Sequence, residues 1–153
     1  MRGRTRRVPR LRLAIAALVV CGCMRSKKGF ENWNPTISPS HFKTIATIAS
    51  SGSRSDIRIM VQLRQDLQKA GVNAVPAAGR WETVSEAMTQ VCGPAGPQPL
   101  DGLVVVGYDH LVLYDCQSLK PAFEIQGAQN TGITAMTERL IKYLKGKAPA
   151  SAG

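Results

Sequence analysis

The segment Leu103–Val106 is an unbroken run of branched apolar residues that follows a loop rich in glycine and proline. Such a run is typical of a strand that is buried on both faces of a sheet. A strand of this kind needs other strands beside it. Further segments with the patterns of strands and helices therefore predict the rest of the fold.

Four other short segments carry β-branched or alternating apolar residues between turn-forming residues, as strands do. They are 42–49, 72–75, 110–114 and 122–125. Three segments instead have apolar residues at helical spacing. The first follows Ser53–Asp56 and stops at Gly71, the second follows a capping box from Thr83 to Glu86, and the third covers 133–144.

In chain order these elements read β-α-β-α-β-β-β-α, and 153 residues leave room for one ordinary domain. The order predicts an α/β fold, built as an α+β two-layer sandwich. Its mixed sheet would have about five strands, with about three helices on one face. We place this single domain at residues 42–146 and a disordered tail at 147–153.

Residues 1–22 predict an export signal. They contain six arginines and no acidic residue, and the arginines precede the apolar run Leu13–Val20. Extended as far as Met24, that run would span about 18 Å as a helix, whereas a bilayer core needs about 30 Å. A cleavable signal peptide is therefore favoured over an uncleaved anchor or a cytosolic protein with a basic arm.

The charge of the chain supports no nucleic-acid partner once this signal is set aside. Removing the six arginines from the 20 basic residues leaves 14 against 10 acidic residues, so the net charge falls from +10 to +4. Aromatic residues make up 5% of the chain, without the aromatic and basic strips that bind single-stranded nucleic acids.

The segment Val20-Cys21-Gly22-Cys23 resembles a bacterial lipobox. The resemblance implies that Cys23 is the first mature residue and carries diacylglycerol and an N-linked acyl chain such as palmitate. Several acyl chains together anchor a protein stably to a membrane. Because Met24 and not an aspartate follows Cys23, the resemblance implies an outer-membrane lipoprotein facing the periplasm, with inner-membrane anchoring or secretion as alternatives.

Residues 23–41 are polar, contain two prolines and show no strand or helix period, which predicts a flexible tether. Phe30 and Trp33 within it could instead dock onto the domain. Two further cysteines, Cys92 and Cys116, lie inside the domain. An oxidising compartment favours a disulfide between them, and two ordinary thiols are the alternative.

Two clusters of polar residues are candidate sites. Asp109, His110 and Asp115 lie close in sequence and suggest an acid-base cluster, but neighbouring residues on a strand point to opposite faces. We therefore assign no catalytic residue. The serine-rich loop before the first helix suggests anion binding at free backbone N–H groups, with simple helix capping as the alternative. Its residues are Ser51, Ser53, Arg54 and Ser55.

Metal and cofactor sites are not predicted. Metal sites need several His, Cys or carboxylate ligands at fixed spacing, and Cys92 with Cys116 has no companion histidines. The serine loop also lacks the glycine patterns of phosphate-binding loops.

The order of elements, with the signal and tether, resembles the amino-terminal domain of the Tol-system periplasmic protein, curli-secretion lipoproteins and lipoprotein activators of penicillin-binding proteins. The resemblance covers 42–145 and rests on Asp101–Val106 and on Leu113–Asp115 with Phe123-Glu124. It implies a lipid-anchored accessory module that binds another envelope protein during assembly, secretion or wall synthesis. A small-ligand or anion-binding domain, or a small hydrolase using Asp109, His110 and Asp115, are the alternatives. The oligomeric state stays open.

Overall fold

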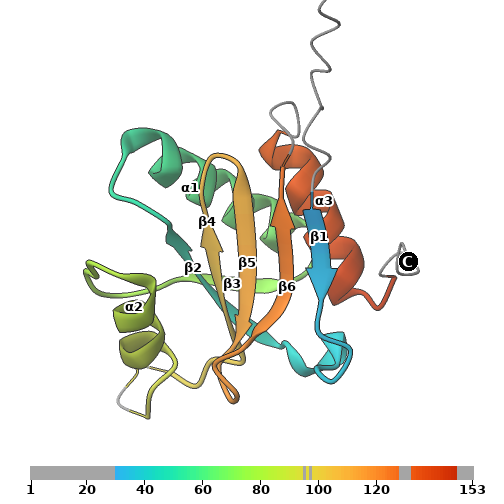
Figure 1. Ribbon diagram of the computed structural model, residues 1–153, viewed down its shortest axis with the longest axis horizontal. Helices are drawn as coiled ribbons and strands as arrows, with labels where there is room; N and C mark the ends of the chain where they lie inside the picture. The colour runs from blue at the N-terminus through green and yellow to red at the C-terminus, as the bar shows by residue number, and fades with distance from the viewer. Residues whose placement is uncertain (1–29, 95, 97, 128–131, 148–153) are drawn as a thin grey trace, which may run out of the picture.

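The computed structural model describes residues 30–94, 96, 98–127 and 132–147 (Figure 1). The predicted signal at 1–22, the lipidation site Cys23 and residues 148–153 of the predicted tail lie outside this part of the chain.

A mixed sheet of six strands, in the order β1-β6-β5-β4-β2-β3, forms the centre of the domain. The strands are β1 (Phe30–Trp33), β2 (Thr44–Ala49), β3 (Asn73–Pro76), β4 (Gly102–Val106), β5 (His110–Asp115) and β6 (Pro121–Gln126). The helices are α1 (Arg54–Lys69), α2 (Val84–Val91) and α3 (Ile133–Leu144), with a short 3-10 helix η1 (Pro39–His41). The predicted α/β class is confirmed, with one strand more than expected.

Strand β2 pairs in parallel with β3 and β4, and the remaining pairs are antiparallel. Strand β4 is buried along its whole length, as its apolar run predicts. Its side chains alternate between two cores: Val104 and Val106 face one, and Leu103 and Val105 face the other.

Helices α1 and α3 contribute to the first core and lie behind the sheet in Figure 1, whereas Ala87 and Val91 of α2 contribute to the second. This differs from the prediction that all helices share one face. The chain crosses from β2 to β3 in one direction and from β3 back past β2 to β4 in the other. Because such crossovers are right-handed, the two helices fall on opposite faces.

Strand β1 lies in the segment predicted as a tether, so that prediction is wrong for Phe30–Trp33. Phe30–Trp33 pairs antiparallel with β6, and Trp33 packs against the first core. The domain therefore includes Phe30–Trp33, and the docking alternative holds for Trp33, whereas Phe30 is 50% exposed. A strand of four residues is too short to show a clear alternation in sequence.

The strand at the other edge of the sheet, β3, has few backbone groups free to pair with an added strand. The backbone carbonyl of Ala74 accepts a hydrogen bond from Gln68 Nε2 at 2.7 Å, and its N–H donates to Val72 O at 2.9 Å. Pro76 has no N–H to offer at the end of the strand. An edge whose groups already have partners is a poor template for an added strand.

Candidate functional site

The structure separates the residues of the suggested acid-base cluster. His110 begins strand β5 and Asp115 ends it, so the strand's rise places them about 17 Å apart. His110 Nδ1 lies 3.0 Å from Asp109 Oδ1 on an exposed turn, and this hydrogen bond holds the pKa of Asp109 below its usual value. The structure does not bring Asp115 into this pair.

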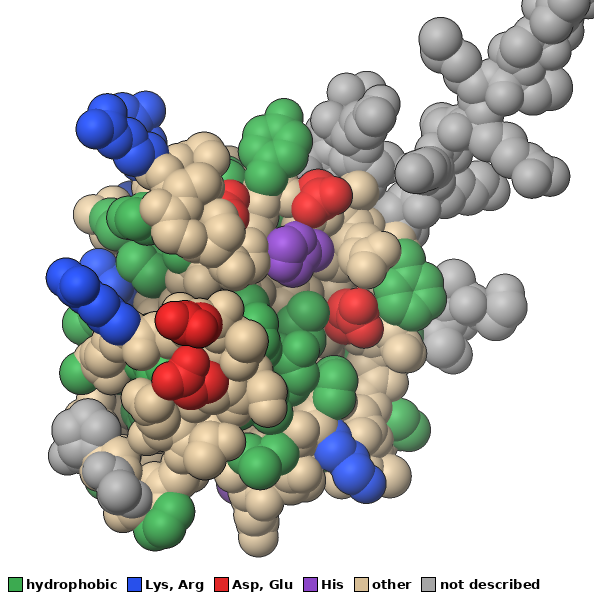
Figure 2. Space-filling view, turned by 60° about the vertical axis from the view of Figure 1, so that its left-hand side comes forward, with side chains coloured by type: hydrophobic (Ala, Val, Ile, Leu, Met, Phe, Trp, Pro, Cys, Tyr) green, Lys and Arg blue, Asp and Glu red, His purple; other side chains and the backbone are tan. Residues whose placement is uncertain are grey.

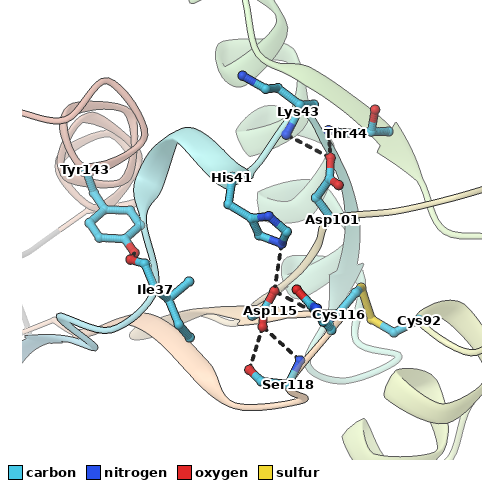
Figure 3. A network of polar contacts seen from close by, with 11 residues as sticks. Ile37, His41, Lys43, Thr44, Cys92, Asp101, Asp115, Cys116, Ser118 and Tyr143 are labelled. Atoms are coloured by element: carbon cyan, nitrogen blue, oxygen red, sulfur yellow. Dashed lines mark hydrogen bonds and ion pairs between the residues drawn. A yellow bond between two sulfur atoms is a disulfide. The ribbon is translucent and has the colours of Figure 1, made fainter.

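Asp115 instead faces a histidine that the sequence did not associate with it (Figure 3). His41 Nε2 lies 3.0 Å from Asp115 Oδ1, and the Asp115 side chain is 6% exposed. Asp115 Oδ2 accepts hydrogen bonds from the hydroxyl and the backbone N–H of Ser118, the latter at 2.8 Å. The pair joins η1 to the turn between β5 and β6.

Burial alone would raise the pKa of Asp115, but the Ser118 hydroxyl, the N–H groups of Ser118 and Gln117, and the nearby His41 together hold it below its usual value. The Ser118 hydroxyl donates to one carboxylate oxygen and His41 Nε2 bonds the other, so both are joined to Asp115 and not to each other. A nucleophilic serine needs a base that takes its proton. The network therefore has a structural role, because it holds η1 against the turn between β5 and β6.

Two further links fasten this end of the sheet. Asp101 Oδ2 accepts the backbone N–H groups of Lys43 and Thr44, both at 2.8 Å, which ties the start of β2 to the start of β4 (Figure 3). The structure also joins Cys92 and Cys116 by a disulfide with Sγ atoms 2.07 Å apart. It links the end of α2 to the end of β5, and is the pairing that the sequence left open.

The opposite end of the parallel strands carries an open groove of about 920 Å³. It lies where the chain leaves β2 for α1 and leaves β3 for the loop before α2. Crevices at the carboxyl ends of parallel strands, where successive crossovers diverge to opposite faces, are the usual ligand sites of open α/β sheets. The groove is therefore the candidate binding site.

The walls of the groove combine apolar side chains with polar ones, among them Ser50, Ser51 and Glu82. Ile57 and Met60 come from α1, and Trp81 and Val84 come from the loop before α2 and its first turn. Ile57 is 44% exposed, which is high for such a side chain. Figure 2 brings this flank of the domain forward and shows hydrophobic side chains open to the surface between charged ones. Arg80 belongs to the same lining.

Trp81 gives the groove a polar group without a partner. Its indole Nε1 is buried and makes no hydrogen bond within the part of the chain that the structure describes. Gly79 lets the indole lie against the backbone, because a Cβ at that position would come 2.8 Å from the Trp81 ring. A buried donor of this kind is normally satisfied, so a turn of the indole toward the groove would let its N–H find an acceptor there.

The serine loop borders this groove, but its polar groups serve helix α1. Ser53 is the N-cap, and its hydroxyl accepts the N–H of Asp56 at 3.1 Å. The hydroxyls of Ser50 and Ser51 donate to Asp56 Oδ2 at 3.0 and 2.6 Å. The buried carboxylate of Asp56 thus accepts the hydrogen bonds that these hydroxyls would otherwise donate to a bound anion.

The other residues of the suggested anion site, Ser53, Arg54 and Ser55, give little support for anion binding. Ser53 and Ser55 share a hydrogen bond of 3.0 Å with each other, and Arg54 is exposed on the first turn of α1. These contacts favour the capping alternative over anion binding.

Among residues 30–147, leaving aside the gaps, no three His, Cys, Asp or Glu side chains gather as a metal site would require. The helices in this range are too short or too polar to cross a membrane.

Comparison with known proteins gives a similarity of fold only. No family model matches the chain, and no curated protein matches it. A PelC dodecamer from Paraburkholderia phytofirmans is 12% identical, with a TM-score of 0.45, over 80% of this chain and 99% of that one. A PelC variant dodecamer from the same organism is 11% identical, with a TM-score of 0.43 over the same shares. A similarity at this level identifies neither a family nor an activity.

Proposed function

We propose that this chain is a lipid-anchored outer-membrane protein that binds an apolar segment of another envelope protein in its groove. The anchor is Cys23 in the lipobox-like segment, and the domain faces the periplasm. The observation that carries the binding role is the buried indole N–H of Trp81, which has no hydrogen-bond partner among the described residues, in the same groove as the exposed Ile57.

The lining of the groove fits a protein segment. Tryptophan, methionine and arginine are enriched where proteins bind one another, and Trp81, Met60 and Arg80 lie together here. An apolar side chain of the partner would pack between Ile57 and Met60. Once the indole turns toward the groove, a backbone carbonyl of the partner would accept the hydrogen bond from Trp81 Nε1.

The proposed mode differs from strand addition. The groups of Ala74 on β3 are already paired, so the partner would contribute side chains to a groove and not a strand to the sheet. The small-ligand alternative has weaker support, since Ser50 and Ser51 are engaged by Asp56.

The binding role is tested by photo-cross-linking in membranes with a photoreactive amino acid at position 57. Position 119 is the matched control, because Leu119 is 47% exposed, close to the exposure of Ile57, and lies outside the groove. We expect one partner to cross-link from position 57 through an apolar segment, and none from position 119. Trp81→Ala should weaken this product without unfolding the domain. Equal cross-linking from both positions would overturn the groove assignment.

The anchor is tested separately by the intact mass of protein extracted from membranes. We expect residues 1–22 to be absent and acyl chains to be attached at Cys23. A Cys23→Ser chain should remain unprocessed and unacylated. Recovery of an unmodified thiol at Cys23 in the wild-type chain would contradict the proposal.

A further inference from the structure

One end of the sheet carries two exposed aromatic side chains. The register aligns Phe30 of β1 with Gln126 of β6, and Gln126 with His110 of β5. Tyr108 lies in the adjoining turn between β4 and β5. Phe30 is 50% exposed and Tyr108 is 71% exposed. We call this end, defined by Phe30 and Tyr108, the aromatic edge, and it is the upper end in Figure 1.

The same edge is where the chain arrives from Cys23. Because β1 begins at Phe30, seven residues (23–29) link the proposed anchor to the sheet, in place of the 19 of the predicted tether. Seven residues reach at most about 25 Å, whereas 19 would reach about 65 Å. An anchored domain is therefore held close to the lipid surface by the end at which β1 begins.

The short reach of residues 23–29 also disfavours the opposite orientation of the domain, in which the aromatic edge points away from the lipid. Strands β5 and β6 each have six residues, which is about 20 Å of sheet. If the end with Asp101 and Asp115 faced the lipid, the connecting residues would first have to run back along this length. Almost none of their reach would remain.

We propose that the aromatic edge rests on the phospholipid surface in which the acyl chains of Cys23 are inserted. This inference rests on the proposed anchor. Aromatic side chains favour the boundary between headgroups and hydrocarbon, and the hydroxyl of Tyr108 keeps access to water there. Asp109 beside it is 69% exposed, so its carboxylate also keeps access to water.

This orientation also determines where the groove lies relative to the bilayer. The backbone N–H of Ser50 donates to Val106 O at 2.8 Å, so the serine loop that borders the groove is attached to the strand that leads into the Tyr108 turn. The groove then opens at the end of the domain nearest the bilayer. A partner bound there would present its apolar segment close to the membrane surface.

The test uses spin labels on the full acylated chain in phosphatidylcholine vesicles. Asp109→Cys labels the aromatic edge while both aromatic residues remain, and Leu119→Cys labels the opposite end. The introduced cysteine is the one reactive thiol, because Cys23 is acylated and Cys92 is bonded to Cys116. We expect the label at 109 to be shielded from a water-soluble nickel chelate and exposed to oxygen, and the label at 119 to show the reverse.

Replacing both aromatic residues, as Phe30→Ser with Tyr108→Ser, should return the label at 109 to water while the vesicles still carry the protein. Protein that floats with the vesicles while both labels are open to the chelate overturns the orientation and leaves the anchor intact. Protein that does not float overturns the anchor and the orientation together.

Discussion

His41 Nε2 lies 3.0 Å from Asp115 Oδ1, although 74 positions separate the two residues in the chain. The contact holds the segment that connects β1 to β2 against the turn after β5. Asp115 also receives both the hydroxyl and the N–H of Ser118, so one buried carboxylate fixes the turn and the preceding segment together. Replacing Asp115 should therefore lower the free energy of unfolding of the whole domain.

Asp115→Asn is expected to lower the free energy of unfolding by about 1–3 kcal/mol, because an amide replaces a charged acceptor of several hydrogen bonds in a buried position. Urea unfolding followed by circular dichroism measures this change. Asp109→Asn is the matched control, since Asp109 is exposed and accepts from His110 alone among the described side chains. Equal effects of the two substitutions would contradict the role assigned to Asp115.

The same carboxylate predicts part of the acid sensitivity. The pKa of Asp115 in the folded state is below its unfolded value, so its stabilisation is complete above about pH 4 and is lost as the pH falls through the folded pKa. Unfolding free energies measured across the acid range should therefore decline less steeply for Asp115→Asn than for the wild type. Parallel acid limbs in the two proteins would show that Asp115 does not titrate in this way.

The disulfide predicts a redox dependence of stability. Cys92 and Cys116 are 24 positions apart, and closing a loop of this size stabilises a fold by about 3 kcal/mol in the chain-entropy model. Thermal unfolding with and without reductant should differ accordingly. The double variant Cys92→Ala with Cys116→Ala should match the reduced wild type and show no response to reductant. A wild type that does not respond either would argue against the bond.

The contacts of Asp56 predict how the serine loop responds to anions. Because the Ser50 and Ser51 hydroxyls donate to this carboxylate, inorganic phosphate should not raise the melting temperature of the wild type. Asp56→Ala should destabilise the domain by about 1–3 kcal/mol through the loss of these hydrogen bonds. A saturable rise with phosphate that disappears in Arg54→Ala would restore the anion-binding hypothesis.

Gly102 predicts a packing limit where β4 begins. A Cβ there would lie 2.8 Å from Phe42 Cδ1 and 2.9 Å from Leu113 Cδ1, both in the first core. Gly102→Ala should therefore lower stability by about 1–3 kcal/mol, as overpacked cores do. Gly52→Ala is the control, because nothing lies within 4 Å of its Cβ. Comparable melting temperatures for the two variants would contradict the packing argument.

Local patterns predicted the elements well, because their causes lie within a few residues. Ser53 and Thr83 accept N–H groups at the starts of α1 and α2, as their positions indicated. Gly71 has a φ of 84°, which is the conformation that ends a helix, and it follows α1 closely. The apolar run at 103–106 is buried on both faces of the sheet.

Features that depend on distant residues were missed. The pairing of Phe30–Trp33 with β6 joins segments far apart in the chain, and the contact of His41 with Asp115 follows from that same closure. The groove arises because α1 and α2 lie on opposite faces. The handedness of crossovers could have indicated this, once the strand order was known. Trp81 carried no signal, because a single tryptophan in a loop shows no period.

Tyr143 predicts the alkaline limit of the fold. Its ring stacks on Phe123 with centroids 5.0 Å apart, and its hydroxyl donates to Ile37 O at 3.4 Å. Burial, helped by the negative charge of Asp115, raises the pKa of Tyr143 to about 12. The folded state therefore holds the neutral phenol beyond the unfolded pKa of about 10, so this stabilisation is present below that pH and is lost as the pH rises through about 12.

Tyr143→Phe should keep the ring in the core and remove the group that ionises. Near neutral pH it should cost less than about 1 kcal/mol, because the hydrogen bond to Ile37 is long. In alkaline solution its unfolding free energy should fall less steeply than that of the wild type. Tyr108→Phe, at the exposed aromatic edge, should leave the alkaline limb unchanged. If the wild type and Tyr143→Phe lose stability in parallel as the pH rises, the buried phenol does not control the alkaline limit.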